Sequence, residues 1–228
     1  MKIAEIYCSR QGEGQLTGTQ SVFIRTSGCN LRCRYCDTPY TSWEPEGEDL
    51  AIDEIVDQAS RLAAEHVVVT GGEPMLFSEL VPLSHELKRR GMHITIETAG
   101  TLYLPVRCDL MSISPKLSNS APSADAHPRW RRRHERTRHA PEVIHRLVSE
   151  YDHQFKFVVD TPADVTEVLQ YLEEFPEIDG RHVQLMPQGT SSDRLAAIAR
   201  WLEPRCAEMG FTYCPRMHIE WYGLTRRT

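Results

Sequence analysis

Residues 66–74 read HVVVTGGEP, and this stretch indicates how the chain folds. The run from His66 to Thr70 is apolar and β-branched, which is typical of a strand that is covered on both faces in a parallel sheet. Gly71 and Gly72 end this strand abruptly. In α/β folds ligands bind at the carboxyl ends of the parallel strands, so Glu73 falls at a candidate site.

Strands and helices alternate on both sides of this stretch. Apolar residues at helical spacing predict helices near residues 52–62, 80–90 and 192–209. Thr161 followed by Pro162 predicts the start of another helix, because threonine caps helices and proline suits their first turn. Short apolar runs predict further strands at residues 3–7, 22–26, 94–97, 110–114, 155–159, 182–186 and 211–214. About six βα units result, fewer than the eight of a closed barrel, and they predict a parallel α/β sheet with right-handed crossovers.

Composition limits the class of protein. The chain has 228 residues, 40% of them hydrophobic, so we expect a single domain with one sizeable core over residues 1–228. Its net charge of −6 gives no reason to expect a surface for duplex nucleic acid. The first residues contain no apolar signal region, and no apolar run approaches the roughly 20 residues of a membrane span. We therefore expect a cytoplasmic protein.

One segment, at about residues 118–138, differs from the rest in composition. It includes most of HPRWRRRHERTRHA, residues 127–140, with six arginines and three histidines. Arginines that neutralise phosphates, with Trp130 stacked on a base, would bind nucleic acid. We favour a solvated helix or loop that keeps an insertion soluble, because no spacing here matches a nucleic-acid motif.

Three of the seven cysteines, Cys29, Cys33 and Cys36, lie together in GCNLRCRYC at residues 28–36. Disulfides are rare in a reducing compartment, so these three are interpreted as metal ligands. Three thiolates on one tight loop can hold three corners of a 4Fe-4S cluster and leave its fourth iron without a protein ligand. Zinc is the alternative, but no second CxxC or HxxxH supplies its fourth ligand. The scattered cysteines, expected to be small buried side chains, are Cys8, Cys108, Cys206 and Cys214.

The CxxxCxxC spacing resembles the signature of the radical S-adenosylmethionine (radical SAM) enzymes, and Tyr35 before the last cysteine fits it as well. GGEP at residues 71–74 resembles the motif with which that superfamily holds the methionyl amino group of S-adenosylmethionine. The resemblance implies that the amino and carboxylate groups of this cofactor bind the fourth iron. It also implies a single-domain α/β fold, a partial (β/α)6-type barrel of the radical SAM kind.

Further motifs resemble the 7-carboxy-7-deazaguanine synthase family. They are RQGEG (10–14), SVFIRTSGCN (21–30), CDT (36–38), ETAG (97–100), SPK (114–116), PRMH (215–218) and WYG (221–223). The resemblance runs nearly end to end, apart from the Arg-rich insertion. It implies a carbon–nitrogen lyase of queuosine and 7-deazapurine biosynthesis, which converts 6-carboxy-5,6,7,8-tetrahydropterin to 7-carboxy-7-deazaguanine with loss of ammonia. A flavodoxin- or ferredoxin-type electron donor, Mg²⁺ and a homodimer are implied as well.

The resemblance assigns roles to individual residues. Arg25 is expected to grip the substrate carboxylate, because a guanidinium in an apolar strand needs a partner and a carboxylate offers two hydrogen bonds. Thr38 is expected to give an oxygen ligand to Mg²⁺. The other groups expected at the pterin are Arg10 (through its backbone), Gln11, Gly12 and Thr98. Those expected to hold S-adenosylmethionine are Gly72, Glu73, Gly100, Ser114, Pro115, Lys116, Gln184, Met186 and Gln188.

Two other functions stay open on the sequence alone. An activase of a glycyl-radical enzyme shares the cluster motif, although it has no need of QGEG, Arg25 and Thr98 together. A zinc-bearing RNA-interaction protein would use the Arg-rich segment. For the favoured family no side chain is expected to act in catalysis beyond the cluster and the cofactor.

Overall fold

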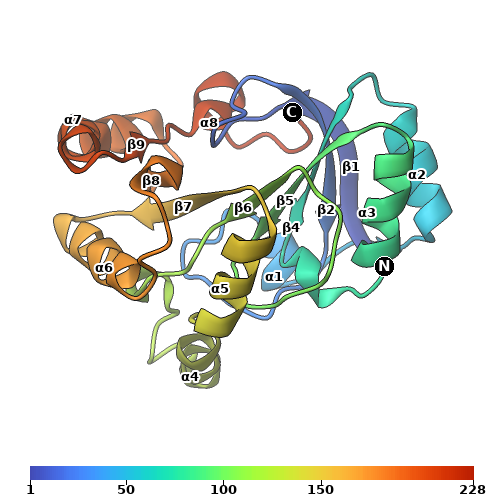
Figure 1. Ribbon diagram of the computed structural model, residues 1–228. Coiled ribbons are helices and arrows are strands. Elements are labelled where there is room, and N and C mark those ends of the chain that lie inside the picture. The colour runs from blue at the N-terminus through green and yellow to red at the C-terminus, as the bar shows by residue number, and fades with distance from the viewer.

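The computed structural model describes residues 1–228, and its strands form one open sheet (Figure 1). The strands are β1 (Lys2–Arg10), β2 (Gln20–Thr26), β3 (Glu48–Asp49), β4 (His66–Gly71), β5 (His93–Thr98), β6 (Leu110–Ile113), β7 (His153–Val159), β8 (Val183–Pro187) and β9 (Thr212–Tyr213). Their order in the sheet is β3-β1-β2-β4-β5-β6-β7-β8-β9. From β2 to β9 every neighbouring pair is parallel. The expected partial barrel is confirmed, since the sheet curves without closing.

The first strand is the exception to the parallel order. β1 is antiparallel to β2 and also to β3. Its connection to β2 covers only residues 11–19, whereas a parallel crossover needs a dozen or more residues. The sequence pattern located this strand but could not give its direction.

Eight α-helices accompany the sheet, and most of them cover its outer face. They are α1 (Pro39–Ser42), α2 (Ile52–Ser60), α3 (Leu80–Arg89), α4 (Pro128–Thr137), α5 (Pro141–Glu150), α6 (Pro162–Glu173), α7 (Ser192–Met209) and α8 (Met217–Tyr222), with short 3₁₀ turns η1 (Pro74–Leu76), η2 (Ser118–Ser120) and η3 (Gly180–His182). The predicted start at Thr161 is present, where Thr161 N donates to Asp164 Oδ2 at 2.8 Å. Helices α4 and α5 and the C-terminal α8 were not specifically predicted. No helix has the length and apolar character that a membrane span requires.

The two faces of the sheet differ in polarity, and this difference creates the site. On β4, Val67 and Val69 belong to the main core with α2 and α3, whereas Val68 and Thr70 face the concave side. The alternation repeats on β7, where Phe155 and Phe157 are in that core and the residues between and beside them face inward. Polar side chains therefore collect inside the barrel. The inward-facing polar residues of the six long parallel strands include Arg25, Thr70, Glu97, Ser112, Gln154, Lys156 and Gln184.

Candidate active site

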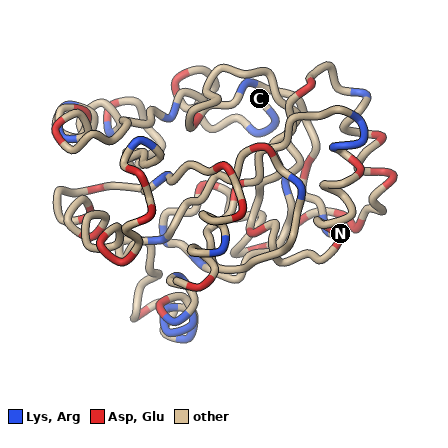
Figure 2. Tube along the Cα trace, viewed as in Figure 1, with Lys and Arg blue, Asp and Glu red and all other residues tan.

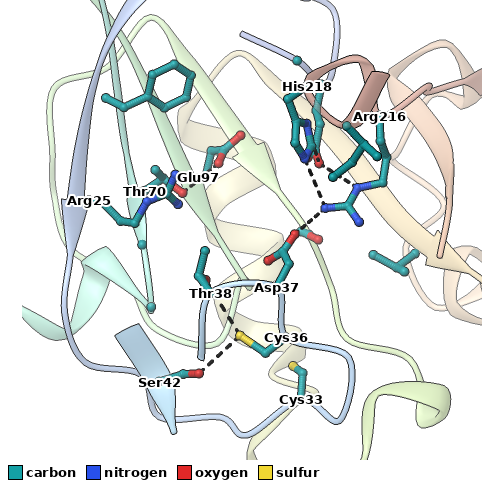
Figure 3. Close-up of a pocket in the computed structure, with 18 of the residues that line it drawn as sticks. Arg25, Cys33, Cys36, Asp37, Thr38, Ser42, Thr70, Glu97, Arg216 and His218 are labelled. Carbon is teal, nitrogen blue, oxygen red and sulfur yellow. Dashed lines mark hydrogen bonds and ion pairs between the residues drawn. The ribbon is translucent and has the colours of Figure 1, made fainter. Parts of the chain in front are cut away.

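A cavity of about 330 Å³ opens at the carboxyl ends of the parallel strands, where Cys33 and Cys36 lie at the base between Arg25 and Arg216 (Figure 3). Loops that follow β2, β4, β5, β6 and β8 meet the C-terminal segment here. The predicted site residues that line the cavity are Arg10, Gln11, Gly12, Arg25, Cys29, Cys33, Cys36, Thr38, Gly72, Thr98, Ser114, Lys116, Met186 and Gln188. The predicted residues that do not line it are Glu73, Gly100, Pro115 and Gln184.

The loop that carries the three cysteines, residues 28–38, rests on the GGEP turn. The backbone N–H of Glu73 donates to Gly28 O at 2.8 Å, and Gly28 N donates to Thr41 O at 2.8 Å. A Cβ atom on Gly72 would lie 2.0 Å from Gly28 O, so this contact between two backbones needs glycine. The GGEP turn thus fixes the position of the cysteine loop.

The arrangement of the three thiols favours one kind of metal group over another. No three His, Cys, Asp or Glu side chains converge closely enough to hold one metal ion. This geometry disfavours a mononuclear zinc site, which needs its ligands around a single ion. In a cubane cluster each thiolate binds a different iron, and Cys29, Cys33 and Cys36 all line one cavity. The donor set therefore fits a 4Fe-4S cluster.

The surroundings of the thiols explain why they need a cationic group. Burial raises the pKa of Cys29 to about 11 and that of Cys33 to about 12. Iron would supply the positive charge that stabilises the thiolates. Cys36 Sγ also lies 3.2 Å from Ser42 Oγ, as Figure 3 shows. None of the four scattered cysteines lines the cavity.

Glu73 is completely buried and contacts protein groups. It accepts hydrogen bonds from Thr98 Oγ1 at 2.9 Å, Ala99 N at 2.8 Å and Met75 N at 3.1 Å. Burial raises its pKa, and the three donors oppose that rise. The carboxylate thereby joins the GGEP turn to the ETAG turn after β5. Its closest partners in this structure are these donors, and Thr98 directs its hydroxyl to Glu73.

Arg25 reaches the cavity from β2 and is held by two neighbours. Its Nε donates to Glu5 Oε1 at 2.8 Å, and its Nη2 donates to Tyr7 OH at 2.8 Å. Tyr40 OH donates to the same Glu5 oxygen at 2.8 Å. Burial alone would lower the pKa of Arg25, but these oxygens raise it above its usual value. The guanidinium is therefore charged and fixed in direction.

The structure adds a buried lysine, Lys156, that was not among the predicted site residues. Lys156 Nζ lies 2.8 Å from Glu97 Oε1 and 3.1 Å from Glu13 Oε2. Burial opposes the charge of Lys156, yet the two carboxylates raise its pKa. The available signal was a lysine inside the apolar strand run FKFVV, the same signal that singled out Arg25.

Arg216 extends this ionic network to the cysteine loop. Its Nε donates to Glu13 Oε1 at 3.2 Å, its Nη1 donates to Gly189 O at 2.6 Å, and its Nη2 pairs with Asp37. Burial would raise the pKa of Glu13, but Lys156 and Arg216 lower it far below its usual range. The same arginine lowers the pKa of Asp37 against the effect of burial. These acidic groups are accordingly ionised in the folded protein.

The QGEG loop packs against the C-terminal segment. Gly12 O accepts a hydrogen bond from Met217 N at 3.0 Å, and a Cβ on Gly12 would lie 2.6 Å from His218 Cβ. The Arg10 guanidinium stacks over Trp221, 4.3 Å from the ring centroid, and its Nε donates to Tyr222 OH at 3.0 Å. The side chain of Arg10 is thus occupied by aromatic residues, in agreement with a ligand contact through its backbone.

Some of the remaining predicted residues line the cavity, and others lie beneath its surface. Lys116 donates to Ser114 Oγ at 2.7 Å, and both line the cavity. Gln184 lies deeper, where its Nε2 donates to Gln154 Oε1 at 2.8 Å. Thr38 precedes α1 and accepts from Thr41 Oγ1 at 3.3 Å. Its hydroxyl faces the cavity beside Asp37, so oxygen atoms suited to a hard cation are present there.

This fold and this three-cysteine site define a radical SAM protein, and residues 23–116 match the radical SAM superfamily. A 7-carboxy-7-deazaguanine synthase of Rhodopirellula baltica is 47% identical over 227 residues, which is 99% of this chain and 88% of the relative. One of Halobacterium salinarum is 41% identical over 229 residues, or 96% of this chain and 89% of the relative. The chain belongs to the 7-carboxy-7-deazaguanine synthase family.

A solved structure shares the fold. QueE from Escherichia coli superposes with a TM-score of 0.71 at 24% identity, covering 95% of this chain and 94% of that one. The family resemblance seen in the sequence is confirmed, and the comparisons support neither a glycyl-radical activase nor a zinc-bearing RNA-interaction protein. As a radical SAM protein, the chain uses a 4Fe-4S cluster and S-adenosylmethionine.

Proposed function

We propose that the chain converts 6-carboxy-5,6,7,8-tetrahydropterin to 7-carboxy-7-deazaguanine with loss of ammonia. The observation that carries this proposal is the presence of Arg25 in the same cavity as the three cysteines. A fixed guanidinium beside a radical SAM cluster suits a small substrate that bears a carboxylate. The product would serve queuosine and 7-deazapurine biosynthesis.

The first task of the protein is to hold the reactive groups. Cys29, Cys33 and Cys36 would bind the cluster, and Gly72 lines the same cavity, where S-adenosylmethionine would lie beside the cluster. When bound, these two groups supply the radical chemistry of the reaction. Ser114, Lys116, Met186 and Gln188 line the same cavity and are the proposed further contacts of the cofactor. Glu73 and Gly100 would act by shaping the two turns.

The second task is to orient the substrate. Arg25 donates its Nε proton to Glu5 and one Nη2 proton to Tyr7. The second Nη2 proton and both Nη1 protons remain available to a substrate carboxylate. Because the guanidinium is already ordered, binding loses little side-chain freedom. Gln11, Gly12 and Thr98 are the proposed polar neighbours of the pterin edge. Lys156 stays protonated between Glu13 and Glu97, so it contributes a fixed charge and does not serve as a base.

A divalent cation and further partners complete the proposal. Thr38 would bind Mg²⁺ through its hydroxyl, together with the substrate carboxylate and water. An external flavodoxin- or ferredoxin-type protein would supply electrons, and two copies of the chain would pair as a homodimer. Residues 1–228 would form one radical SAM core, with the Arg-rich segment at about 118–138 as an insertion that contains η2 and α4.

Anaerobic turnover tests the proposed reaction. The iron-loaded protein is incubated with S-adenosylmethionine, Mg²⁺, dithionite and the tetrahydropterin, and the products are identified by mass spectrometry. We expect 7-carboxy-7-deazaguanine, ammonia and 5'-deoxyadenosine or regenerated S-adenosylmethionine. The variant with all three cluster cysteines changed to alanine is the control. Cleavage of S-adenosylmethionine without any deazaguanine product would refute the proposed substrate.

A further inference from the structure

Helix α4 presents a basic face to solvent. Its exposed arginines follow the i, i+3, i+4, i+7 spacing of one helical face, and they are Arg129, Arg132, Arg133 and Arg136. None of them pairs with a carboxylate, whereas Arg131 and Arg138 pair with Glu135. Figure 2 shows this concentration of positive charge at α4, on a chain whose net charge is −6. We call these four residues the α4 basic face.

This helix packs directly on the cysteine loop. His134 is buried, and its Nδ1 accepts from Arg32 N at 3.3 Å while its Nε2 lies 2.8 Å from Ser120 Oγ. The guanidinium of Arg32 stacks over Trp130, 4.1 Å from the ring centroid. Arg32 stands between two of the cluster cysteines. The basic face is therefore carried by a helix that is fixed to the loop that would hold the cluster.

An aromatic pair connects the start of α4 to the same loop. The exposed ring of His127 lies 4.7 Å from the ring of Trp43. Trp43 Nε1 donates to Cys33 O at 3.0 Å. A planar redox group that stacks near this pair would lie close to a cluster ligand.

We propose that the α4 basic face docks a flavodoxin, an acidic protein whose flavin gives up one electron at a time. In the step served by docking, a flavin hydroquinone loses one electron and becomes a semiquinone. The oxidised 4Fe-4S cluster gains that electron and changes from the 2+ to the 1+ state. This inference rests on the proposed function only in requiring a cluster at the three cysteines.

The charge of the α4 basic face and its position beside the cysteine loop together favour a flavodoxin as the partner. A basic face attracts an acidic protein and orients its approach. RNA is also acidic, but its binding would give no reason for the arginines to lie beside the cysteine loop. The aromatic pair favours a flavin, because a flat ring system can stack there.

The test uses the iron-loaded enzyme and a reduced flavodoxin as the probe. The variant is Arg129→Glu with Arg132→Glu. The matched control is Arg200→Glu with Arg205→Glu, which makes the same change in net charge at exposed positions on α7, away from α4 (Figure 1). Binding is measured calorimetrically at low and high salt, and reduction of the cluster is followed by its absorbance and electron paramagnetic resonance.

We expect the wild type and the α7 control to bind flavodoxin in a salt-dependent manner, and the α4 variant to bind it at least about tenfold more weakly. Reduction by flavodoxin should slow to a similar extent, while dithionite still reduces the cluster and supports turnover. The proposal is overturned if flavodoxin does not bind the wild type, or if it binds the α4 variant equally well. Binding of a short single-stranded RNA that needs Arg129 and Arg132, with flavodoxin binding unchanged in the variant, would overturn it as well. Failure of the dithionite assay alone would count against the proposed reaction and not against docking.

Discussion

Arg25 Nε donates a hydrogen bond of 2.8 Å to Glu5 Oε1, so the residue proposed to grip the substrate is itself held by a buried carboxylate. Glu5 lies on β1 and Arg25 on β2, in a directly paired register. The antiparallel pairing of these strands brings the two charges together. A guanidinium bound in this way cannot swing out of the cavity when the substrate is absent.

The first prediction concerns Arg25→Lys. A lysine offers one point charge on a flexible stem, and it cannot contact Glu5 and a substrate carboxylate with a fixed planar fork. We expect substrate affinity to fall by at least about tenfold, because a charge-assisted pair in a desolvated site is lost. Cofactor cleavage without substrate should be retained. A variant that binds the tetrahydropterin normally but cannot assemble its cluster would show that Arg25 has a structural role.

The second prediction concerns the cluster ligands. Changing Cys29, Cys33 and Cys36 together to alanine should abolish iron binding, measured as iron and sulfide content after anaerobic reconstitution. Cys108→Ala is the matched control, since Cys108 is half-buried and lies outside the cavity. Iron retained by the triple variant would require other ligands.

The third prediction concerns Mg²⁺. Thr38→Ala removes a hydroxyl that faces the cavity while leaving the three thiols in place. The absorbance of the cluster should persist, and the stimulation of turnover by Mg²⁺ should weaken. Thr38→Ser, which keeps the oxygen, should restore the response. An unchanged Mg²⁺ dependence in the alanine variant would remove Thr38 from the cation site.

The fourth prediction concerns pH and the ionic network. The pKa of Glu13 is lower in the folded protein than its ordinary value of 4.5. The stability that it contributes is therefore fully present above pH 4.5 and is lost as the pH falls below that value. Glu13→Gln should lower the free energy of unfolding by about 3 kcal/mol at neutral pH, since Lys156 and Arg216 lose a buried partner.

Urea unfolding at several pH values measures this effect. The difference between the wild type and Glu13→Gln should shrink as the pH drops through and below 4.5. Glu44→Gln is the control, because Glu44 is exposed and makes no ion pair. A difference that stays constant with pH would mean that the charge of Glu13 is not what stabilises the fold.

The fifth prediction concerns the contact between the two loops. Gly72→Ala would place a Cβ 2.0 Å from Gly28 O, so the cysteine loop must move. We expect markedly reduced iron binding and a lower unfolding temperature. Gly91→Ala is the comparison, because its Cβ would meet nothing within 4 Å and only its positive φ of 77° costs about 1 kcal/mol. Equal iron content in the two variants would contradict the proposal that the GGEP turn holds the cysteine loop in position.

The sequence pattern predicted where most of the strands lie and how deeply HVVVT is buried, but not the direction in which each strand pairs. The run HVVVT is buried on both faces, as its β-branched composition predicts, and the glycines after it are packed too tightly for any side chain. The direction of β1 was not predictable in the same way, because the same alternating pattern suits either direction of pairing. Helix α5 was not recognised either, although Ile144 and Leu147 are fully in the core.

The sequence by itself determined the features that depend on neighbouring residues. Three such features are the cysteine spacing, the GGEP turn and the capped helix at Thr161. Each depends on backbone geometry over a few neighbouring positions, so each could be predicted from the sequence. Only the tertiary structure decided which distant charges meet. Glu13 contacts Lys156 across 143 residues and Arg216 across 203 residues, because strand order and register bring the QGEG loop, β7 and the C-terminal segment to one end of the sheet. A buried charge must find a partner, but the sequence does not say which one, since the partner depends on how the whole sheet is assembled.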